Sequence, residues 1–491
     1  MKELLLYSYG YLVFFYSMAL MASYVMLMLL AHISIRRSRY KMLEDNINGL
    51  FRNSPYVPGV SIIAPAYNEE NTIVTNVRSL LSQNYSKFEV IIVNDGSKDR
   101  TLEKMIEAFE LEQVPYNYHQ RILAKPFKAM YVSKNSAYYR LRVVDKENGG
   151  TKADPVNAGL NVANYPYFIN TDVDCILAKD AIMKCIRPMM EIPNTIAVSG
   201  VMTMSNACVV ENGELKEYRI PGSPIPLFQT LEYMRSFMVG KLGWSAINAM
   251  PNVSGGYGMF DTKVAIAAGG YSSDSLAEDM DMLIRMIGYC CDFKRKYRVV
   301  QIPSTCCWTE GPSNVRLLYR QRSRWGHGLI QTFGKYYRMI GRKRYRQLGL
   351  ITMPYLLIFE FLAPFIELVG LGTFIYLAFT GGVNWNTAFI IFAVMYIFCL
   401  QLSIVVIYYD YTQTKMKNLS YVKLIVAAIL EPFVYHPMIV IFSLCGYFRF
   451  LMKKKIVWGE MTRKGFAQDG RPEEKTEGRE TDEENNKQSK E

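Results

Sequence analysis

Residues 60–95 read VSIIAPAYNEENTIVTNVRSLLSQNYSKFEVIIVND, and this stretch decides the fold of the soluble part of the chain. Val60 to Ala64 is a short apolar run ended by a proline, which is typical of a buried strand. Residues 71–81 follow with apolar residues at helical spacing, and residues 88–93 form a second apolar run before the turn signal Asn94-Asp95-Gly96. A strand, a helix and a strand at this spacing predict a βαβ unit and a parallel sheet.

Polar residues follow the ends of these predicted strands. Ligands of parallel αβ sheets bind at the carboxyl ends of the strands. Asn68 and Asp95 both stand directly after a predicted strand, so we expect them on one rim of the sheet. A further strand-like run at residues 167–169 places Asp172 and Asp174 at another strand end. The pattern predicts an α/β domain over about residues 59–310.

Membrane-length apolar segments flank this domain. The segment from Leu4 to Ile35 contains no Asp, Glu, Lys or Arg, and such a run can cross a hydrocarbon core of roughly 30 Å. A signal peptide is the alternative, but its apolar part is usually only about 7–15 residues, and no clear small-residue cleavage site follows the run. Further apolar blocks lie at about 349–379, 383–409 and 421–450.

The formal net charge of +12 raises the alternative of a nucleic-acid-binding protein. The basic residues, however, stand beside the apolar segments, which is the positive-inside pattern of membrane proteins. We therefore expect a lipid bilayer and no nucleic acid as partner. The residues concerned are Arg36, Arg37, Arg39, Lys41, Arg338, Arg342, Lys343, Arg344, Arg346 and Lys453 to Lys455.

The nine cysteines show no metal-ligand spacing. Cys290-Cys291 and Cys306-Cys307 are adjacent pairs rather than C-x-x-C motifs. Because most of the cysteines lie in the segment that we expect in the cytosol, free thiols are the prediction.

Asp172 and Asp174, separated by one residue at a strand end, could converge on one hard cation. Mg²⁺ or Mn²⁺ held by one or two carboxylates and by phosphates is a usual arrangement. Two aspartates in a solvated turn are the alternative. Lys152 precedes the pair, after Gly149-Gly150 and at the start of a predicted helix, where a phosphate-bearing ligand is favoured; the alternative is a surface lysine.

Asp279 is the candidate general base, because transfer of a sugar to a hydroxyl requires a carboxylate that removes the hydroxyl proton. Glu278-Asp279 opens a predicted helix, so helix-start acids that only meet the dipole are the alternative; Asp281 is expected to be that case. Gln321, Arg324 and Trp325 follow. Arg can bind phosphate oxygens and a Trp face suits a sugar ring, whereas interfacial belt residues are the alternative.

In this order the motifs resemble those of the membrane-embedded processive glycosyltransferases of family 2, which have a GT-A catalytic domain and include synthases of cellulose, hyaluronan, chitin-like oligomers and poly-N-acetylglucosamine. The resemblance runs from about Val60 to Gly328 and continues more weakly to Phe466. The matching segments are Pro65 to Glu70, Val93 to Ser97, Lys152 to Gly159, Asp172-Val173-Asp174, Ser254 to Phe260, Glu278-Asp279, Thr309 to Pro312 and Gln321 to Trp325.

The resemblance implies a role for each motif. It implies that Tyr67, Glu69 and Asp95 hold the uracil and ribose of a UDP-sugar, with Lys152 also on the donor side, that Asp172 contacts the nucleotide and that Asp174 holds the metal. It implies that Asp279 is the general base. Gln321 and Arg324 would bind the diphosphate, Trp325 the acceptor sugar, and Ser254, Gly255 and Gly256 would form part of the acceptor floor beside Glu278. Trp458 and Arg463 resemble the gating segment of hyaluronan-type synthases, with an interfacial Trp and Arg as the alternative.

The expected fold is an α/β GT-A cytosolic domain with a mixed, mostly parallel sheet, combined with a helical transmembrane region. Its segments are 1–35, an N-terminal anchor; 36–58, a basic connector; 59–312, the glycosyltransferase domain; 313–348, amphipathic interfacial helices with QxxRW; 349–450, a C-terminal membrane region; 451–466, the gating segment; and 467–491, a disordered charged tail.

A cytosolic tail requires an even number of spans after residue 348, but there are three apolar blocks. The block 421–450 is interrupted by Pro432 and Pro437, and proline kinks a helix, so we predict two spans and an interfacial or re-entrant segment there. Glu360 and Glu367, seven residues apart, are expected on one helix face. We expect them to line a channel for the growing glycan; the alternative is a paired or protonated contact between helices of the bundle.

The sequence therefore predicts a multi-pass protein of the cell membrane that polymerises a sugar from a UDP-sugar onto a growing glycan and exports it, with a small membrane or periplasmic export partner. N-acetylglucosamine is the expected sugar, from the poly-N-acetylglucosamine and hyaluronan-like layout. Two alternatives stay open. One is a single-transfer enzyme with a lipid-linked acceptor. The other is a transporter or scaffold with an inactive nucleotide-sugar domain.

Overall fold

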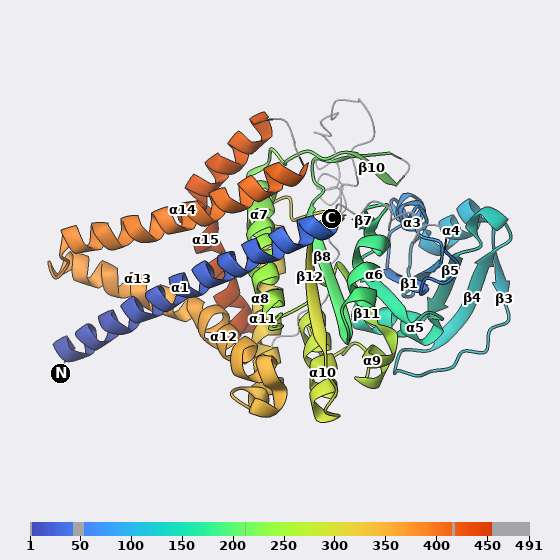
Figure 1. The fold of residues 1–491 in the computed structure, drawn as a ribbon, viewed down its shortest axis with the longest axis horizontal. Helices are drawn as coiled ribbons and strands as arrows, with labels where there is room; N and C mark the ends of the chain where they lie inside the picture. Colours follow the sequence, from blue (N-terminus) through green and yellow to red (C-terminus); the bar gives the residue numbers. More distant parts are fainter. Residues whose placement is uncertain (1, 43–53, 212, 415–417, 454–491) are drawn as a thin grey trace, which may run out of the picture.

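The computed structural model describes residues 2–42, 54–211, 213–414 and 418–453. A twisted sheet with helices packed on it forms the catalytic part of the chain, and long helices extend from one side of it (Figure 1). The strands are β1 (Val60–Ala66), β2 (Phe88–Asn94), β3 (Leu111–Val114), β4 (Phe127–Ser133), β5 (Leu141–Lys146), β6 (Tyr167–Thr171), β7 (Ile176–Leu177), β8 (Thr195–Met204), β9 (Val209–Glu211), β10 (Glu214–Glu217), β11 (Tyr257–Asp261) and β12 (Arg298–Thr309).

The expected βαβ unit is confirmed. β1 pairs in parallel with β2, and α3 (Ile73–Leu81) connects them. β1 also pairs in parallel with β6, and β2 with β5, so that four parallel strands lie side by side. Both faces of these strands are covered, which explains why their residues form continuous apolar runs rather than alternating ones.

One antiparallel strand changes which residues reach the carboxyl edge. The sheet order is β3-β4-β5-β2-β1-β6-β11-β8-β12-β7, and β11 runs antiparallel between β6 and β8. Tyr257 at the start of β11 pairs with Thr171 at the end of β6. The segment before β11 therefore lies at the edge where the parallel strands end. The expectation of a mixed, mostly parallel sheet with a helical region is confirmed.

The helices of the catalytic part pack on the sheet and on one another (Figure 1). They are α4 (Thr101–Phe109), α5 (Ala153–Val162), α6 (Ala181–Glu191), α7 (Pro224–Arg235), α8 (Leu242–Ala246), α9 (Thr262–Ala267), α10 (Glu278–Asp292) and α11 (Val315–Tyr336), with a π-helical turn η2 (Ser236–Lys241) between α7 and α8. The helix starts expected at Lys152 and at Glu278 are observed.

Within the described residues, four helices are long and apolar enough to cross a membrane: Gly10–Arg37, Leu348–Phe379, Trp385–Thr412 and Ser420–Leu451. The first lies within α1 (Lys2–Met42). The second is built from η5 (Leu348–Thr352), α12 (Met353–Leu356), η6 (Leu357–Phe361) and α13 (Ala363–Phe379), and the last two lie within α14 (Trp385–Thr414) and α15 (Asn418–Leu451).

α15 is a single helix that contains both Pro432 and Pro437. A re-entrant segment reverses its direction and so needs a break, which α15 lacks. The helix is therefore continuous across both prolines, which favours the interfacial over the re-entrant form of the predicted segment. A packed helix tolerates proline, because neighbouring side chains and helices stabilise the freed backbone groups. The prediction of an interfacial or re-entrant segment itself stays a prediction.

α15 contacts α14 near its start and α11 near its end. Near its start, Tyr421 donates a hydrogen bond to Asp410 of α14, and the charge of Asp410 adds to the burial that raises the pKa of Tyr218, just after β10. Near its end, Phe450 packs against His327 of α11 at 5.1 Å between ring centroids. This course is what a helix lying along the domain would show.

Glu360 and Glu367 both lie beside α15. Oε2 of Glu367 is 2.8 Å from Nε2 of His436, and the backbone oxygen of Glu360 accepts a bond from Tyr447 at 3.5 Å. Glu360 belongs to the π-helical turn η6, which winds differently from an α-helix. A spacing of seven residues therefore does not by itself place these two side chains on one face.

Candidate active site

Asp172 and the Ser254-Gly255-Gly256 segment are brought together by the antiparallel pairing of β6 with β11. The side chain of Asn170 donates to the backbone oxygen of Gly255 at 3.1 Å, and Thr171 donates to that of Gly256 at 3.0 Å. Polar side chains at the end of β6 thus hold the glycines against the aspartate. A Cβ added to Gly256 would lie 3.6 Å from Oδ2 of Asp172, in ordinary contact.

Lys152 reaches into this junction from the start of α5. Its Nζ donates to the backbone oxygen of Gly255 at 2.7 Å and forms an ion pair with Asp172. Burial alone would lower the pKa of Lys152, but the charges of Asp172 and Glu278 outweigh it and raise that pKa. The lysine is therefore a cation held among carboxylates, where an anionic ligand would compete for it.

Glu278 and Asp279 face the same glycines from the first turn of α10. A Cβ on Gly255 would lie 3.7 Å from Cβ of Asp279, from Oε1 of Glu278 and from Nζ of Lys152. Asn252 donates from Nδ2 to Oδ2 of Asp279 at 3.0 Å, which orients the carboxylate. Burial raises the pKa of Glu278, while the charge of Arg324 opposes this rise.

α11 carries the Gln321, Arg324 and Trp325 motif and packs closely on the loop before α10. A Cβ on Gly328 would lie 2.9 Å from the backbone nitrogen of Ala277, so only a glycine permits this approach. Gln321 accepts a hydrogen bond from Gln229 of α7 at 2.9 Å, and Trp325 remains 38% exposed. The structure thus places α11 against Glu278-Asp279.

The predicted donor side lies at the ends of β1 and β2. Asn68 adopts a left-handed conformation with φ of 56°, which asparagine tolerates better than most residues. Its Oδ1 accepts from the backbone of Lys98 at 2.9 Å, so the expected single rim of Asn68 and Asp95 is observed. Tyr67 is 39% exposed beside it, and Glu69 accepts from Thr72 at 2.8 Å.

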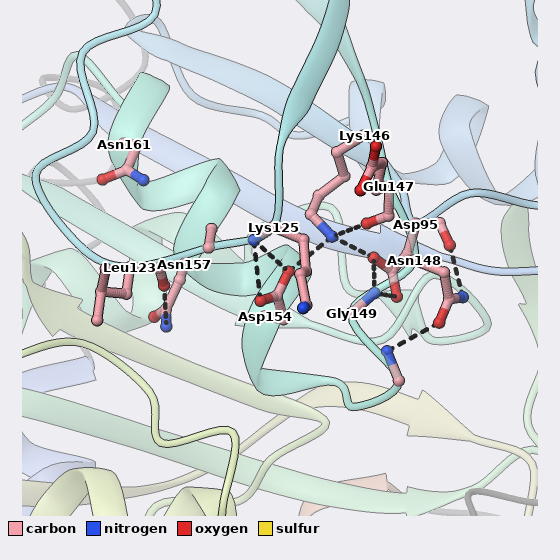
Figure 2. A network of polar contacts seen from close by, with 12 residues as sticks. Asp95, Leu123, Lys125, Lys146, Glu147, Asn148, Gly149, Asp154, Asn157 and Asn161 are labelled. Carbon is pink, nitrogen blue, oxygen red and sulfur yellow. Dashed lines mark hydrogen bonds and ion pairs between the residues drawn. The ribbon is translucent and has the colours of Figure 1, made fainter.

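Asp95 belongs to a buried charge network (Figure 2). Nζ of Lys146, at the end of β5, lies 2.5 Å from Asp95 and 2.6 Å from Asp154, and Lys146 is fully buried. The backbone N–H of Gly149 donates to Asp95 at 3.0 Å. Burial raises the pKa of Asp95, while Lys146 acts in the opposite direction. The network ties three segments of the donor side together.

Sequence reasoning missed Lys146 and Asn252 because each acts through a partner distant in the chain. A signal existed for Lys146, a charged residue at an inward-facing position of the strand β5. Asp281 lies in the first turn of α10, as expected, and is also buried, pairing with Arg285 at 2.7 Å and with Lys335 of α11 at 2.8 Å. Trp458 and Arg463 lie outside the described residues.

Asp172, Asp174 and Cys175 offer ligand atoms that all lie within 4.8 Å of one another. The two carboxylates suit a hard divalent cation, whereas the soft, buried thiol of Cys175 does not. The donor set therefore fits Mg²⁺ or Mn²⁺ held by the aspartates alone.

Comparisons with known proteins agree with this geometry. A family model described as "Glycosyl transferase family 2" matches residues 61–229, and one described as "Glycosyl transferase family group 2" matches residues 226–408. Residues 61–408 of the chain thus match models of family 2 glycosyltransferases. The two matches together include every motif placed above.

Among curated relatives, this glycosyltransferase is 27% identical over 272 residues to a poly-beta-1,6-N-acetyl-D-glucosamine synthase of Staphylococcus epidermidis, over 55% of each chain. It is 25% identical over 294 residues to the synthase of that name from Staphylococcus aureus strain MSSA476, over 60% of this chain and 58% of the other. The chain thus matches little more than half the length of these relatives.

Among solved structures, a mannosyltransferase from Pyrobaculum calidifontis in complex with GDP-Man and Mn²⁺ is similar at 18% identity and a TM-score of 0.49. The match covers 90% of this chain and all of the other. A likeness at this level bears on neither substrate nor mechanism. The GT-A fold expected from the sequence is confirmed by the family match and the sheet.

Proposed function

We propose that this family 2 enzyme is a processive inverting glycosyltransferase. It transfers N-acetylglucosamine from a UDP-sugar to the end of a growing polysaccharide and exports the product. One observation carries the proposal: Lys152, Asp172, Glu278 and Asp279, from three separate segments, meet around Gly255. A cation that can bind a diphosphate therefore lies beside a carboxylate that can accept a proton.

Asp279 acts as the general base. Its carboxylate removes the proton of an acceptor hydroxyl, whose oxygen attacks C1 of the donor sugar from the side opposite the diphosphate. The bond between C1 and the phosphate oxygen breaks, UDP leaves with the electron pair, and the configuration at C1 inverts. Asn252 holds the base through a hydrogen bond of 3.0 Å.

Lys152, Gln321 and Arg324 bind the diphosphate, since cationic and amide donors stabilise the charge that develops on the leaving group. Mg²⁺ or Mn²⁺ bound to Asp172 and Asp174 would neutralise further negative charge on it. Tyr67, Glu69 and Asp95 bind the uracil and ribose, and Trp325 binds the acceptor sugar above a floor formed by Ser254, Gly255 and Gly256.

N-acetylglucosamine as the sugar is supported by the names of the curated relatives, which are poly-beta-1,6-N-acetyl-D-glucosamine synthases. These relatives match over little more than half of their length.

We place the catalytic domain in the cytosol, where UDP-sugars are found, and α15 along the membrane interface. The basic residues Arg36 and Arg37 at the end of the first apolar helix support this side. With α1, the Leu348–Phe379 helix and α14 as spans, the tail after α15 also lies in the cytosol. Mapping of a C-terminal tag tests this topology, and an external tag would contradict it.

Export would use a polar path beside α15. Glu367 of the Leu348–Phe379 span forms a polar pair with His436 of α15, at 2.8 Å. Intramembrane ionisable groups are costly and commonly face a partner or a polar pathway. Substitution of both Glu360 and Glu367 by alanine is expected to shorten the glycan product and to reduce its export. Unchanged glycan length and export would mean that these two residues only make contacts between helices.

Purified protein incubated with a panel of labelled UDP-sugars and Mn²⁺ tests the proposal. We expect UDP release and polymeric products with UDP-N-acetylglucosamine. Products extended by a single sugar would favour the alternative of a lipid-linked acceptor. The absence of turnover with every donor would favour the inactive scaffold.

A further inference from the structure

Arg322 is the one basic residue of the Gln321–Trp325 motif for which neither the resemblance nor the proposed reaction has a role. Its guanidinium is buried and donates to both oxygens of Glu232 of α7, at 2.7 and 2.5 Å. It also donates to the hydroxyl of Tyr435 of α15 at 3.1 Å. Tyr435 in turn donates to Glu232 at 2.7 Å. One guanidinium therefore joins three helices.

The same guanidinium lies over the indole ring of Trp325, with Cζ 4.3 Å from the ring centroid. Arg322 is buried, whereas Trp325 is partly exposed. A planar cation stacked on an indole is an attractive contact that depends on orientation. The cation that lies over Trp325 is thus itself held by a carboxylate and a phenol from two other helices.

Two further residues of α7 contact the helices that carry Arg322 and Tyr435. Gln229, one turn before Glu232, donates to Gln321 at 2.9 Å, and Phe228 stacks on Tyr435 at 5.4 Å between ring centroids. α7 therefore contacts both the motif helix α11 and the apolar helix α15. A shift of α15 would move Tyr435, and with it the carboxylate that fixes Arg322.

We propose that Glu232, Arg322 and Tyr435 form a clamp that positions Trp325 for the acceptor sugar and transmits the position of α15 to it. The three are positioning residues, not catalytic ones, because none is assigned a contact with substrate. The inference rests on the proposed function for the identity of the ligand of Trp325. It goes beyond that function by assigning acceptor affinity to contacts outside the substrate site.

The test compares donor and acceptor affinity in full-length protein in detergent or nanodiscs. UDP-N-acetylglucosamine is the donor and short N-acetylglucosamine oligomers are the acceptor probe. Glu232→Gln is expected to raise the acceptor KM by about tenfold while the donor KM changes less than about twofold. Arg322→Lys, which keeps the charge but loses the planar stack, is expected to have the same effect, and Tyr435→Phe a smaller one.

Glu431→Gln is the matched control. Glu431 of α15 forms a second ion pair with α7, through Arg235, one turn along from Glu232. Its loss weakens the same helix contact without touching Arg322 or Trp325. If Glu431→Gln raised the acceptor KM as much as Glu232→Gln, the effect would be general loosening and the clamp would be refuted.

A second readout does not need turnover. The fluorescence of Trp325 is obtained as the difference between each protein and its Trp325→Phe counterpart. Glu232→Gln is expected to change the acrylamide quenching of this component, and Glu431→Gln to leave it as in the wild type. Unchanged quenching in Glu232→Gln overturns the inference, whereas wild-type protein inactive with every UDP-sugar overturns only the proposed function.

Discussion

Nζ of Lys152 donates a hydrogen bond of 2.7 Å to the backbone oxygen of Gly255, across 103 positions of the chain. The contact joins the start of α5 to the segment before β11, and the same lysine pairs with Asp172 at the end of β6. The proposed reaction uses this cation to bind the phosphates of the donor. It also predicts which substitution will affect donor binding.

Lys152→Met is expected to raise the KM for the UDP-sugar by about 10- to 100-fold, because a buried charge-assisted contact is lost and Asp172 is left without its counterion. UDP release at varied donor concentration measures it. Lys134→Met is the control: its ion pair with Glu112 is exposed, and such pairs contribute little. If the two substitutions changed the donor KM equally, the assignment of Lys152 to the donor site would be wrong.

Asp279→Asn is expected to lower kcat by about 10²- to 10⁴-fold, with little change in the donor KM, because the amide cannot accept the acceptor proton. The oxygen of the amide can still accept the hydrogen bond that Asn252 donates, so the side chain keeps its position. Asp292→Asn, on the same helix but in an exposed pair with Arg344, serves as the comparison and should retain activity. A fully active Asp279→Asn protein would exclude this residue as the base.

Lys146→Met is expected to destabilise the protein by about 3–5 kcal/mol at neutral pH, because Asp95 and Asp154 then share a buried site without a cation. The sign of the pH dependence follows from the folded pKa of Asp95, which burial already raises and which loss of Lys146 raises further. An acid with a raised folded pKa binds more protons folded than unfolded, so stability falls as pH rises through that folded pKa.

The defect of Lys146→Met should therefore lessen as the pH is lowered from 7 towards 5. Thermal unfolding of variant and wild type in the same detergent at several pH values measures the difference. A defect that is constant over this range would mean that the carboxyl groups do not titrate there, contrary to this account.

Gly446→Ala should destabilise the contact between α15 and α11 by about 1–3 kcal/mol or more. An added Cβ would lie 2.3 Å from the backbone oxygen of Ser323, so one helix must move away. Gly372→Ala is the control in another apolar helix, where nothing lies within 4 Å of the added atom. Comparable melting temperatures for both variants would contradict this packing.

Removal of divalent cations by EDTA is expected to abolish UDP release, and Mn²⁺ or Mg²⁺ should restore it. Asp174→Asn should raise the Mn²⁺ concentration needed for half-maximal activity by tenfold or more, because an amide oxygen carries no charge for the cation. The dependence of activity on Mn²⁺ concentration measures this. If Asp174→Asn left the Mn²⁺ concentration for half-maximal activity unchanged, Asp174 would not be a ligand of the metal.

The sequence by itself determined the elements and the edge on which the motifs lie. Apolar runs ending in polar residues predicted β1, β2 and β6, and parallel strands must end at one edge, so Asp95 and Asp172 were predictable from spacing alone. The four long apolar helices were predictable for the same reason, since length and composition suffice.

Only the tertiary structure decided which partners these residues have. Glu232 lies 90 positions from Arg322, and Tyr435 lies 113 positions from it, and no local pattern encodes such pairs. Pro432 and Pro437 were expected to kink a helix, and only the structure shows that α15 continues through both of them. Periodicity reports which side of an element is buried, whereas the identity of the group that meets it depends on how distant segments pack.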